Sequence, residues 1–272
     1  QEVFAAYGPQ AGRLESVVIS NEVKVIQDHA FHGCKGLESV TLPAGLTAIG
    51  ANAFAECVNL RFTAALPSSI TKIGWSAFHY CTSLNKINVP EGVTTIEDNT
   101  FCCCTGLASV SLPAGLTSIK STAFYGCNGL QSLLLPAGVL HCGAMAFMNC
   151  RNLAKIEIPT SMKTIKPHTF SGCRNLCRVI FPDGVATIEK RAFANCKLLD
   201  GLALPSGLKV IEAAAFSGCT RLGNTEPVVL PAGLEQVGAL AFCDCIQVCV
   251  APLTNVDPTA FRGVRSVSHC RD

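Results

Sequence analysis

The chain repeats one pattern of apolar and polar positions about every 23 residues. Phenylalanine marks the period: an Ala or Thr precedes each marker Phe, and an Ile, Val or Cys stands five residues before it. A fixed period of this length indicates a solenoid, in which each unit buries its apolar side chains only against its neighbours. The marker residues are Phe31, Phe54, Phe78, Phe101, Phe124, Phe147, Phe170, Phe193, Phe216, Phe242 and Phe261.

Within one unit, the pattern predicts a strand, a turn, a second extended stretch and an arc. In LESVTLPAGL, residues 37–46, apolar side chains flank Thr41, which is the alternation of a strand with one buried face. Pro43 ends the strand because it has no N–H to donate. LPAG predicts a type I turn with Pro43 in the second position and Gly45 in the fourth. A second extended stretch ends at Ile49, and the arc then carries the Ala-Phe pair.

The repeating unit, LxxVxLPxGLxxIxxxAFxxC, resembles the leucine-rich repeats of the BspA-like family over residues 14–267. The resemblance implies a leucine-rich repeat solenoid, a curved right-handed β-rich superhelix, that acts by protein recognition. We expect about eleven 23-residue coils with a parallel β-sheet on the concave face. They form a single domain, in which 1–13 and 262–272 are capping segments and 14–261 are repeats.

Three departures from the period predict bulges or loops. Residues 60–66 hold one extra residue, and residues 222–230 hold three, including Pro227. The last step, from Phe242 to Phe261, is four residues short.

Ten of the 17 cysteines occupy one repeat position, three residues after the Phe, and Cys142 takes the place of an Ile. We interpret them as small buried residues, because parallel side chains in a ladder do not offer disulfide geometry. A disulfide framework is the alternative, and a local bridge near Cys245 would involve Cys243 and Cys249. The pattern does not fix the redox state of the cysteines outside the column, which are Cys102, Cys103, Cys177, Cys243, Cys249 and Cys270.

Composition and charge argue against several classes of function. Lys and Arg number 21 against 19 Asp and Glu, without basic runs, so we expect no nucleic-acid binding. No apolar stretch reaches the roughly 18 residues that cross a bilayer, and we expect no membrane-spanning segment. The cysteine spacing lacks the pairs that hold zinc, and we expect no metal and no cofactor. The chain begins at Gln1, and we expect a processed or trimmed N-terminus.

Motifs for catalysis are absent from the sequence. There is no Gly-rich phosphate loop, GxSxG elbow or HExxH helix. The pairs His79 with Asp98 and His168 with Glu189 occur once each, on arcs expected to be exposed, and a solvated surface explains them. We therefore expect no enzymatic activity and no catalytic residue.

The residues that vary lie at the outward position of each main strand, here named the outer row. Its C-terminal half is mostly apolar, and exposed apolar surface commonly marks interaction sites. We therefore predict a non-catalytic scaffold that binds a partner protein through Leu134, Ile180, Ala203 and Val229, with Lys155, Glu157 and Arg178 as polar contacts. The outer row is Val18, Thr41, Asn88, Ser111, Leu134, Glu157, Ile180, Ala203 and Val229.

Two alternatives stay open at this point. One is a structural subunit of a large multiprotein assembly, which would account for a charged content of only 15%. The other is a cell-surface adhesin, which the family resemblance suggests. The sequence leaves the location unknown, with a reducing compartment or organelle interior slightly favoured over the cell surface.

Overall fold

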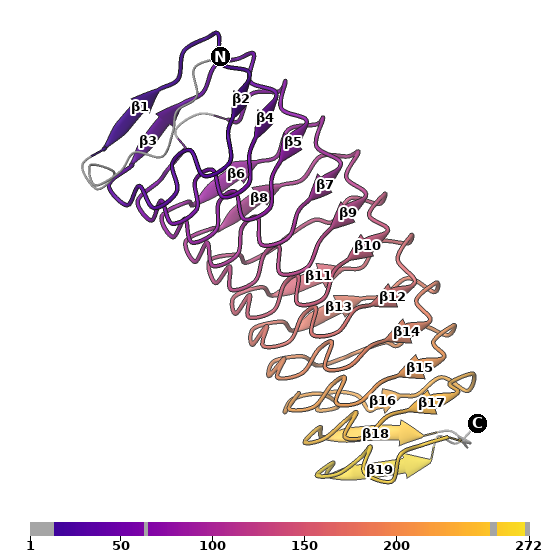
Figure 1. Ribbon diagram of the computed structural model, residues 1–272. Coiled ribbons are helices and arrows are strands. Elements are labelled where there is room, and N and C mark those ends of the chain that lie inside the picture. The colour runs from indigo at the N-terminus through magenta and orange to yellow at the C-terminus, as the bar shows by residue number, and fades with distance from the viewer. Residues whose placement is uncertain (1–13, 63–64, 251–254, 270–272) are drawn as a thin grey trace.

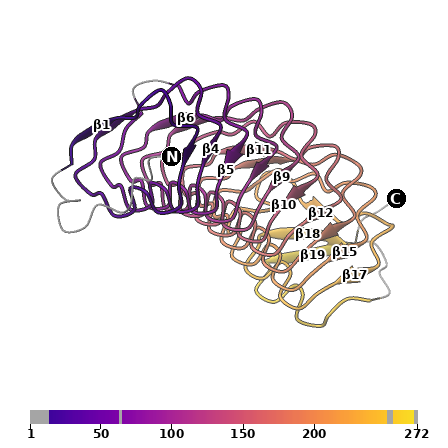
Figure 2. The same ribbon diagram turned by 45° about the horizontal axis from the view of Figure 1, so that its top comes forward.

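The structure is a computed structural model that describes residues 14–62, 65–250 and 255–269. Across these residues the chain winds into coils stacked along a curved axis, and no α-helix occurs among them (Figures 1 and 2). Strands β1 and β19 stand at opposite ends of the stack (Figure 1). The predicted parallel-strand solenoid of about eleven turns is confirmed.

The main sheet is built from the first strand of those coils in which such a strand forms. Each strand pairs in parallel with the equivalent strand of a neighbouring coil, for example Val17 with Val40. The main-sheet strands are β1 (Ser16–Val18), β3 (Ser39–Thr41), β6 (Lys86–Asn88), β8 (Ser109–Ser111), β11 (Lys155–Glu157), β13 (Arg178–Ile180), β16 (Val228–Val229), β18 (Gln247–Val250) and β19 (Ser266–His269).

A second column of two-residue strands follows the turn in each coil. The second residue of each strand, such as Ile49 or Ile73, points into the core and is buried. The strands are β2 (Val25–Ile26), β4 (Ala48–Ile49), β5 (Lys72–Ile73), β7 (Thr95–Ile96), β9 (Ser118–Ile119), β10 (His141–Cys142), β12 (Thr164–Ile165), β14 (Thr187–Ile188), β15 (Val210–Ile211) and β17 (Gln236–Val237).

The turn between the two strand columns begins one residue later than the sequence predicted. The Leu46 N–H donates to the Pro43 carbonyl at 3.0 Å, so Pro43 is the first residue of the turn and Gly45 the third. Gly45 does not have a positive φ, so the residues still form a type I and not a type II turn. Pro43 extends the strand into the turn because its fixed φ also suits extended backbone.

The main sheet is interrupted where its central inward residue is not β-branched. Every main strand carries Val or Ile at this position. In the coils around Leu133 and Leu202 the position is Leu, and no strand forms there. β-Branched side chains fit a pleated, half-buried surface better than Leu. Figure 1 shows the resulting groups of strands, such as β6 with β8 and β11 with β13.

The arcs stack continuously through the Phe column. Neighbouring rings from Phe31 to Phe261 lie parallel, with centroids 5.2–5.9 Å apart and interplanar angles of 3–20°. From Phe31 to Phe242, each Phe N–H donates to the carbonyl of the Ala or Thr before the next Phe, at 2.7–3.0 Å. The arc therefore combines aromatic packing with a backbone ladder, and the predicted Phe ladder is present.

Each full arc contains two residues in the left-handed backbone region, two positions before and two positions after the Phe. Around Phe193 these are Arg191 with φ of 54° and Asn195 with φ of 61°. Left-handed backbone costs a residue with a Cβ roughly 1–2 kcal/mol. The arc retains this conformation because the N–H groups of Arg191 and Asn195 donate to the next coil.

The cysteine column packs as predicted and also donates hydrogen bonds that the pattern did not reveal. Its members are buried and free. The Cys57 Sγ donates to the Phe31 carbonyl oxygen of the previous coil at 3.0 Å, and the contact recurs along the column to Cys245. A thiol is a weak donor that also fills an apolar slot, so Cys satisfies both requirements of this position.

The local bridge near Cys245, which the sequence left open as an alternative, does not form among Cys243, Cys245 and Cys249. Cys243 and Cys245 are both free, whereas Cys249 is disulfide-bonded. Because β18 is extended, Cys249 lies in the main sheet opposite Val229 and is carried away from the arc that holds the other two cysteines. Cys270 lies outside the described residues.

Replacing Phe147, a ring in the middle of the ladder, should destabilise the whole stack. Phe147→Ala removes a fully buried side chain that stacks on Phe124 and Phe170. We expect the free energy of unfolding to fall by about 3–5 kcal/mol in urea titrations. The half-buried neighbour Met148 serves as the control, since Met148→Ala should cost clearly less. Equal losses for the two variants would contradict the ladder's role.

Glycine at position 191, where the backbone is left-handed, should make the protein more stable than arginine does. The Arg191 side chain is exposed, so Arg191→Gly mainly relieves backbone strain and should stabilise the protein by up to about 1 kcal/mol. In the reverse control, Gly172→Ala, a methyl group would meet the Asn149 Oδ1 at a φ of 74° and should destabilise. Thermal unfolding of both variants measures whether each substitution raises or lowers the stability. A loss of stability in Arg191→Gly would contradict the claim that the backbone at position 191 is strained.

Candidate protein-interaction surface

The outer row faces solvent along the main sheet. Val18 and Leu134 are each 78% exposed and Val229 is 56% exposed, whereas Ile180 is half-buried. The register places Glu157 beside Ile180 in neighbouring strands. From Leu134 to Val229 the row crosses four coil steps, about 19 Å. The four predicted apolar residues therefore share one face of the solenoid.

Two cations lie side by side at the start of strands β11 and β13. Lys155 is the direct cross-strand neighbour of Arg178, and both side chains are exposed. Like charges directly opposite one another destabilise a sheet. Within the described residues, neither cation forms a salt bridge, since the two ion pairs there are Lys166 with Glu189 and Lys209 with Glu235. The Lys155–Arg178 pair is thus available to an external carboxylate.

A pocket of about 370 Å³ opens between Ala203 and Val229. It lies where residues 201–204 leave the sheet ladder and where the three-residue insertion lengthens the next coil. Leu202, Leu204, Glu226, Pro227 and Pro231 complete much of its lining. The outer-row pattern identified Ala203 and Val229 but not the other residues that line the pocket. The only sign of them in the sequence was the three-residue insertion at residues 222–230.

Asp200 fixes the insertion to the preceding coil. Its Oδ1 accepts from the N–H groups of Gly201, Asn224 and Thr225 at 2.9, 3.2 and 3.3 Å. Burial alone would raise the pKa of Asp200, but these hydrogen bonds stabilise the carboxylate and lower the pKa below its usual value. Asp200 therefore ties together Gly201, which lines the pocket, and the residues that precede Glu226 in the pocket wall.

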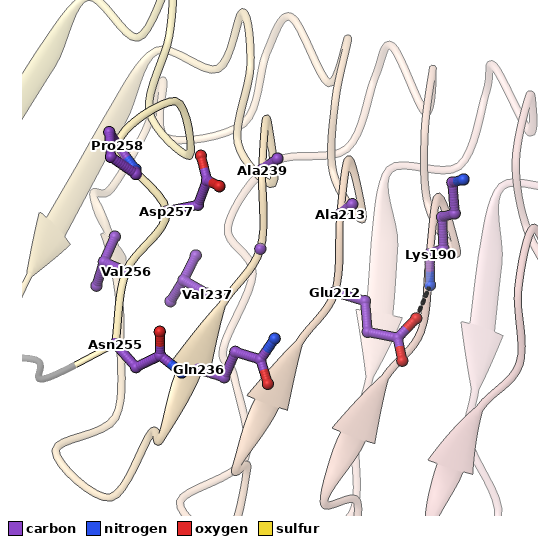
Figure 3. A pocket seen from close by; sticks show the side chains of 11 residues that line it. Lys190, Glu212, Ala213, Gln236, Val237, Ala239, Asn255, Val256, Asp257 and Pro258 are labelled. Carbon is purple, nitrogen blue, oxygen red and sulfur yellow. Dashed lines mark hydrogen bonds between the residues drawn. The ribbon is translucent and has the colours of Figure 1, made fainter.

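A second pocket, of about 550 Å³, lies beside the second strand column near the C-terminal end. Figure 3 shows Glu212, Gln236 and Asn255 projecting from successive coils beside a floor that includes Ala213 and Ala239. The Glu212 carboxylate accepts from the Lys190 N–H at 2.9 Å. None of the residues that line this pocket belongs to the outer row.

Among the described residues, neither His79 with Asp98 nor His168 with Glu189 forms an ion pair. Glu189 forms its ion pair with Lys166 at 2.8 Å, and the buried Nδ1 of His168 has no hydrogen-bond partner. Burial lowers the pKa of His168, assisted by the nearby charges of Arg191 and Lys190. Burial also lowers the pKa of His79. These histidines therefore favour the neutral form in separate arcs.

Comparison with known families identifies the repeat. Six copies of the BspA type leucine rich repeat region match residues 9–131 and 94–223, more than half of the chain. The chain belongs to the BspA-type leucine-rich repeat family. No curated protein matches it. No helix among the described residues is long and apolar enough to span a membrane.

Solved structures with the same fold include several bacterial proteins. A leucine rich cell surface protein from Faecalibacterium prausnitzii is 27% identical, with 95% of this chain and 80% of that chain covered and a TM-score of 0.60. A leucine-rich repeat protein from Bacteroides ovatus is 25% identical over 90% of this chain and 79% of that chain, also with a TM-score of 0.60. The pneumococcal vaccine antigen PcpA, at 19% identity, 93% and 73% coverage and a TM-score of 0.56, shares the fold.

Removing the Asp200 carboxylate should loosen the pocket wall in a pH-dependent way. Asp200→Ala should lower the free energy of unfolding by about 1–2 kcal/mol at pH 7. Because the folded pKa is lowered, the stabilisation is present above the unfolded pKa of about 3.9 and is lost as pH falls through the folded pKa. Urea titrations between pH 7 and 3 measure the difference from wild type, which should shrink on acidification.

The exposed Asp183 provides the matched control. Asp183→Ala should change stability by much less at every pH. A difference for Asp200→Ala that stayed constant from pH 7 to 3 would contradict the role of the charge.

Proposed function

We propose that this protein is a non-catalytic scaffold that binds a partner protein through the C-terminal half of the outer row. The observation that carries the proposal is the combination of exposed Leu134 and Val229 with the pocket beside Ala203. Exposed apolar side chains next to a concave, partly apolar site are typical of interaction anchors. Membership of a leucine-rich repeat family supports the same class of function.

The polar residues define what the partner must offer. Lys155 and Arg178 place two positive charges side by side. A carboxylate of the partner bound between them would neutralise their repulsion. Glu157 lies across from Ile180 and adds one negative charge on the same face. The matching surface would therefore present apolar side chains toward the pocket and an acidic group toward the cations. Such complementarity contributes to specificity and to the rate of association.

Recognition at a cell surface is the second candidate function. The supporting observation is the similarity to the Faecalibacterium prausnitzii protein described as a leucine rich cell surface protein. A subunit of a large assembly would use the same outer row, but would keep it covered permanently. Surface labelling of intact source cells separates the two: labelling supports recognition at the surface, and its absence together with stable co-purification supports the subunit.

The outer row itself provides a matched test of the binding face. Partner proteins captured by the wild-type chain from its source are identified and purified, and their affinities are then measured by calorimetry. Leu134→Asp and Val229→Asp should each weaken binding at least about tenfold, as loss of an interface anchor does. Thr41→Asp and Ser111→Asp, at equivalent positions in the N-terminal half, should leave the affinity within about twofold.

Circular dichroism should show that all four variants retain the fold, since the replaced side chains are exposed. Equal binding by the wild type, Leu134→Asp and Val229→Asp would refute the assignment of this face. Equal weakening by all four substitutions would place the contact along the entire row.

A further inference from the structure

Cys102 and Cys103 form a pair of free thiols on the arc that follows Phe101. Their Sγ atoms are 3.6 Å apart. Cys103 occupies the left-handed position two residues after the Phe, with φ of 59°. This backbone brings two sequence-adjacent side chains together, although adjacent residues in a strand would point to opposite faces. Neither thiol donates to the Phe carbonyls as the cysteine column does, so the pair is not required by the core.

The position of the pair allows access from outside. Cys103 is half-buried, and Cys102 is 7% exposed beside it. Tyr80, from the preceding arc, has a side chain that is 45% exposed, and its backbone N–H donates to the Cys102 carbonyl at 2.9 Å. The three groups come from two neighbouring coils that the Phe ladder holds in register.

Disulfide formation does not suit this pair. The peptide between the two residues is trans, which sets neighbouring Cα atoms about 3.8 Å apart. Disulfides usually join Cα atoms about 4.4–6.8 Å apart, and shorter spans strain the bond. The pair therefore favours two separate sulfur ligands over a bond between them.

The separation of the sulfur atoms suits a single ion instead. A thiolate lies about 2.3 Å from a tetrahedral zinc ion, so two thiolates on one such ion are about 3.8 Å apart. The observed 3.6 Å differs from this by about 0.2 Å, which small side-chain rotations can supply. In many zinc sites, a CxxC sequence brings two thiols close together. In this chain the left-handed backbone at Cys103 brings together the thiols of two adjacent cysteines instead.

We propose that Cys102 and Cys103 form a two-thiolate site for a soft, thiophilic metal ion such as Zn²⁺, Cd²⁺ or Cu⁺. Thiolates select such ions over hard cations. Water would occupy the remaining positions around the ion. No group of three or more His, Cys, Asp or Glu side chains in the described part of the chain is placed to hold a metal, so this ion would be exchangeable and not structural.

Proton release accompanies binding. Each thiol loses its proton as a sulfur–metal bond forms, so one divalent ion releases two protons and no electron is transferred. Binding should therefore strengthen as pH rises, with about two protons released per ion where both thiols are protonated before binding.

Cadmium is the probe for this site, because thiolate–cadmium bonds give an ultraviolet charge-transfer band. Titration of the reduced full chain should show one ion with the band intensity of two thiolates. Cys102→Ser and Cys103→Ser should each weaken binding at least about tenfold, because each removes one arm of the chelate. Cys177→Ser, which replaces an exposed cysteine outside the pair, should leave binding unchanged.

A measurement on the wild-type chain keeps the proposal testable if a variant does not fold. Mass spectrometry after alkylation should show that cadmium protects Cys102 and Cys103 but not Cys177. Alkylation of all three at unchanged rates would overturn the proposal. So would a Cys102→Ser/Cys103→Ser double variant that keeps the two-thiolate band, because the ion would then be bound elsewhere.

Discussion

Stacking of each Phe arc on the next is the interaction on which the rest of the solenoid depends. The aromatic rings lie parallel, and the Phe N–H groups form a backbone ladder alongside them. The main sheet does not provide comparable continuity, because no strand forms at residues 201–204 and the coil around Leu133 keeps only an isolated bridge, from Ser132 to Lys155. Removal of an arc would expose fully buried rings and unpaired backbone groups together, and both are costly.

The same arcs explain two unusual features of the composition. Cysteine suits its column because a small thiol fills the slot and donates to the Phe carbonyl of the preceding coil. Non-glycine residues adopt left-handed backbone because inter-coil hydrogen bonds hold them there. Residues that meet neither requirement, including the outer row and Cys102, are free to vary. The proposed functions use those positions.

The period made most of the fold predictable from the sequence. The Phe column, the strand–turn–strand order and the exposed outer row follow from side chains that recur at fixed positions. The turn register was wrong by one residue, because Pro43 can occupy either of two positions in a type I turn and the sequence does not show which carbonyl accepts. The sheet interruptions had a signal in Leu133 and Leu202, but strand propensity is too context-dependent to establish them alone.

The candidate site was only partly predictable. Alternation placed Leu134 and Val229 outside, but the pocket depends on how the insertion folds and on the three N–H groups that Asp200 binds. The Cys102–Cys103 contact depends on the positive φ of Cys103. The sequence gives no sign of this φ, because the residue is not glycine. Each of these features comes from backbone geometry that occurs in one coil only. A pattern that describes what all coils share cannot predict it.

Native-state amide hydrogen exchange tests the central claim most directly, because it measures the arcs and the main sheet in one molecule. The account predicts that the N–H groups of Phe147, Phe170 and Phe193 exchange only on global unfolding. It predicts fast exchange for Ala203 and Leu204, whose N–H groups have no hydrogen-bond partner among the described residues. Exchange of the arc amides as fast as that of Ala203 would contradict the claim that the arcs hold the solenoid together.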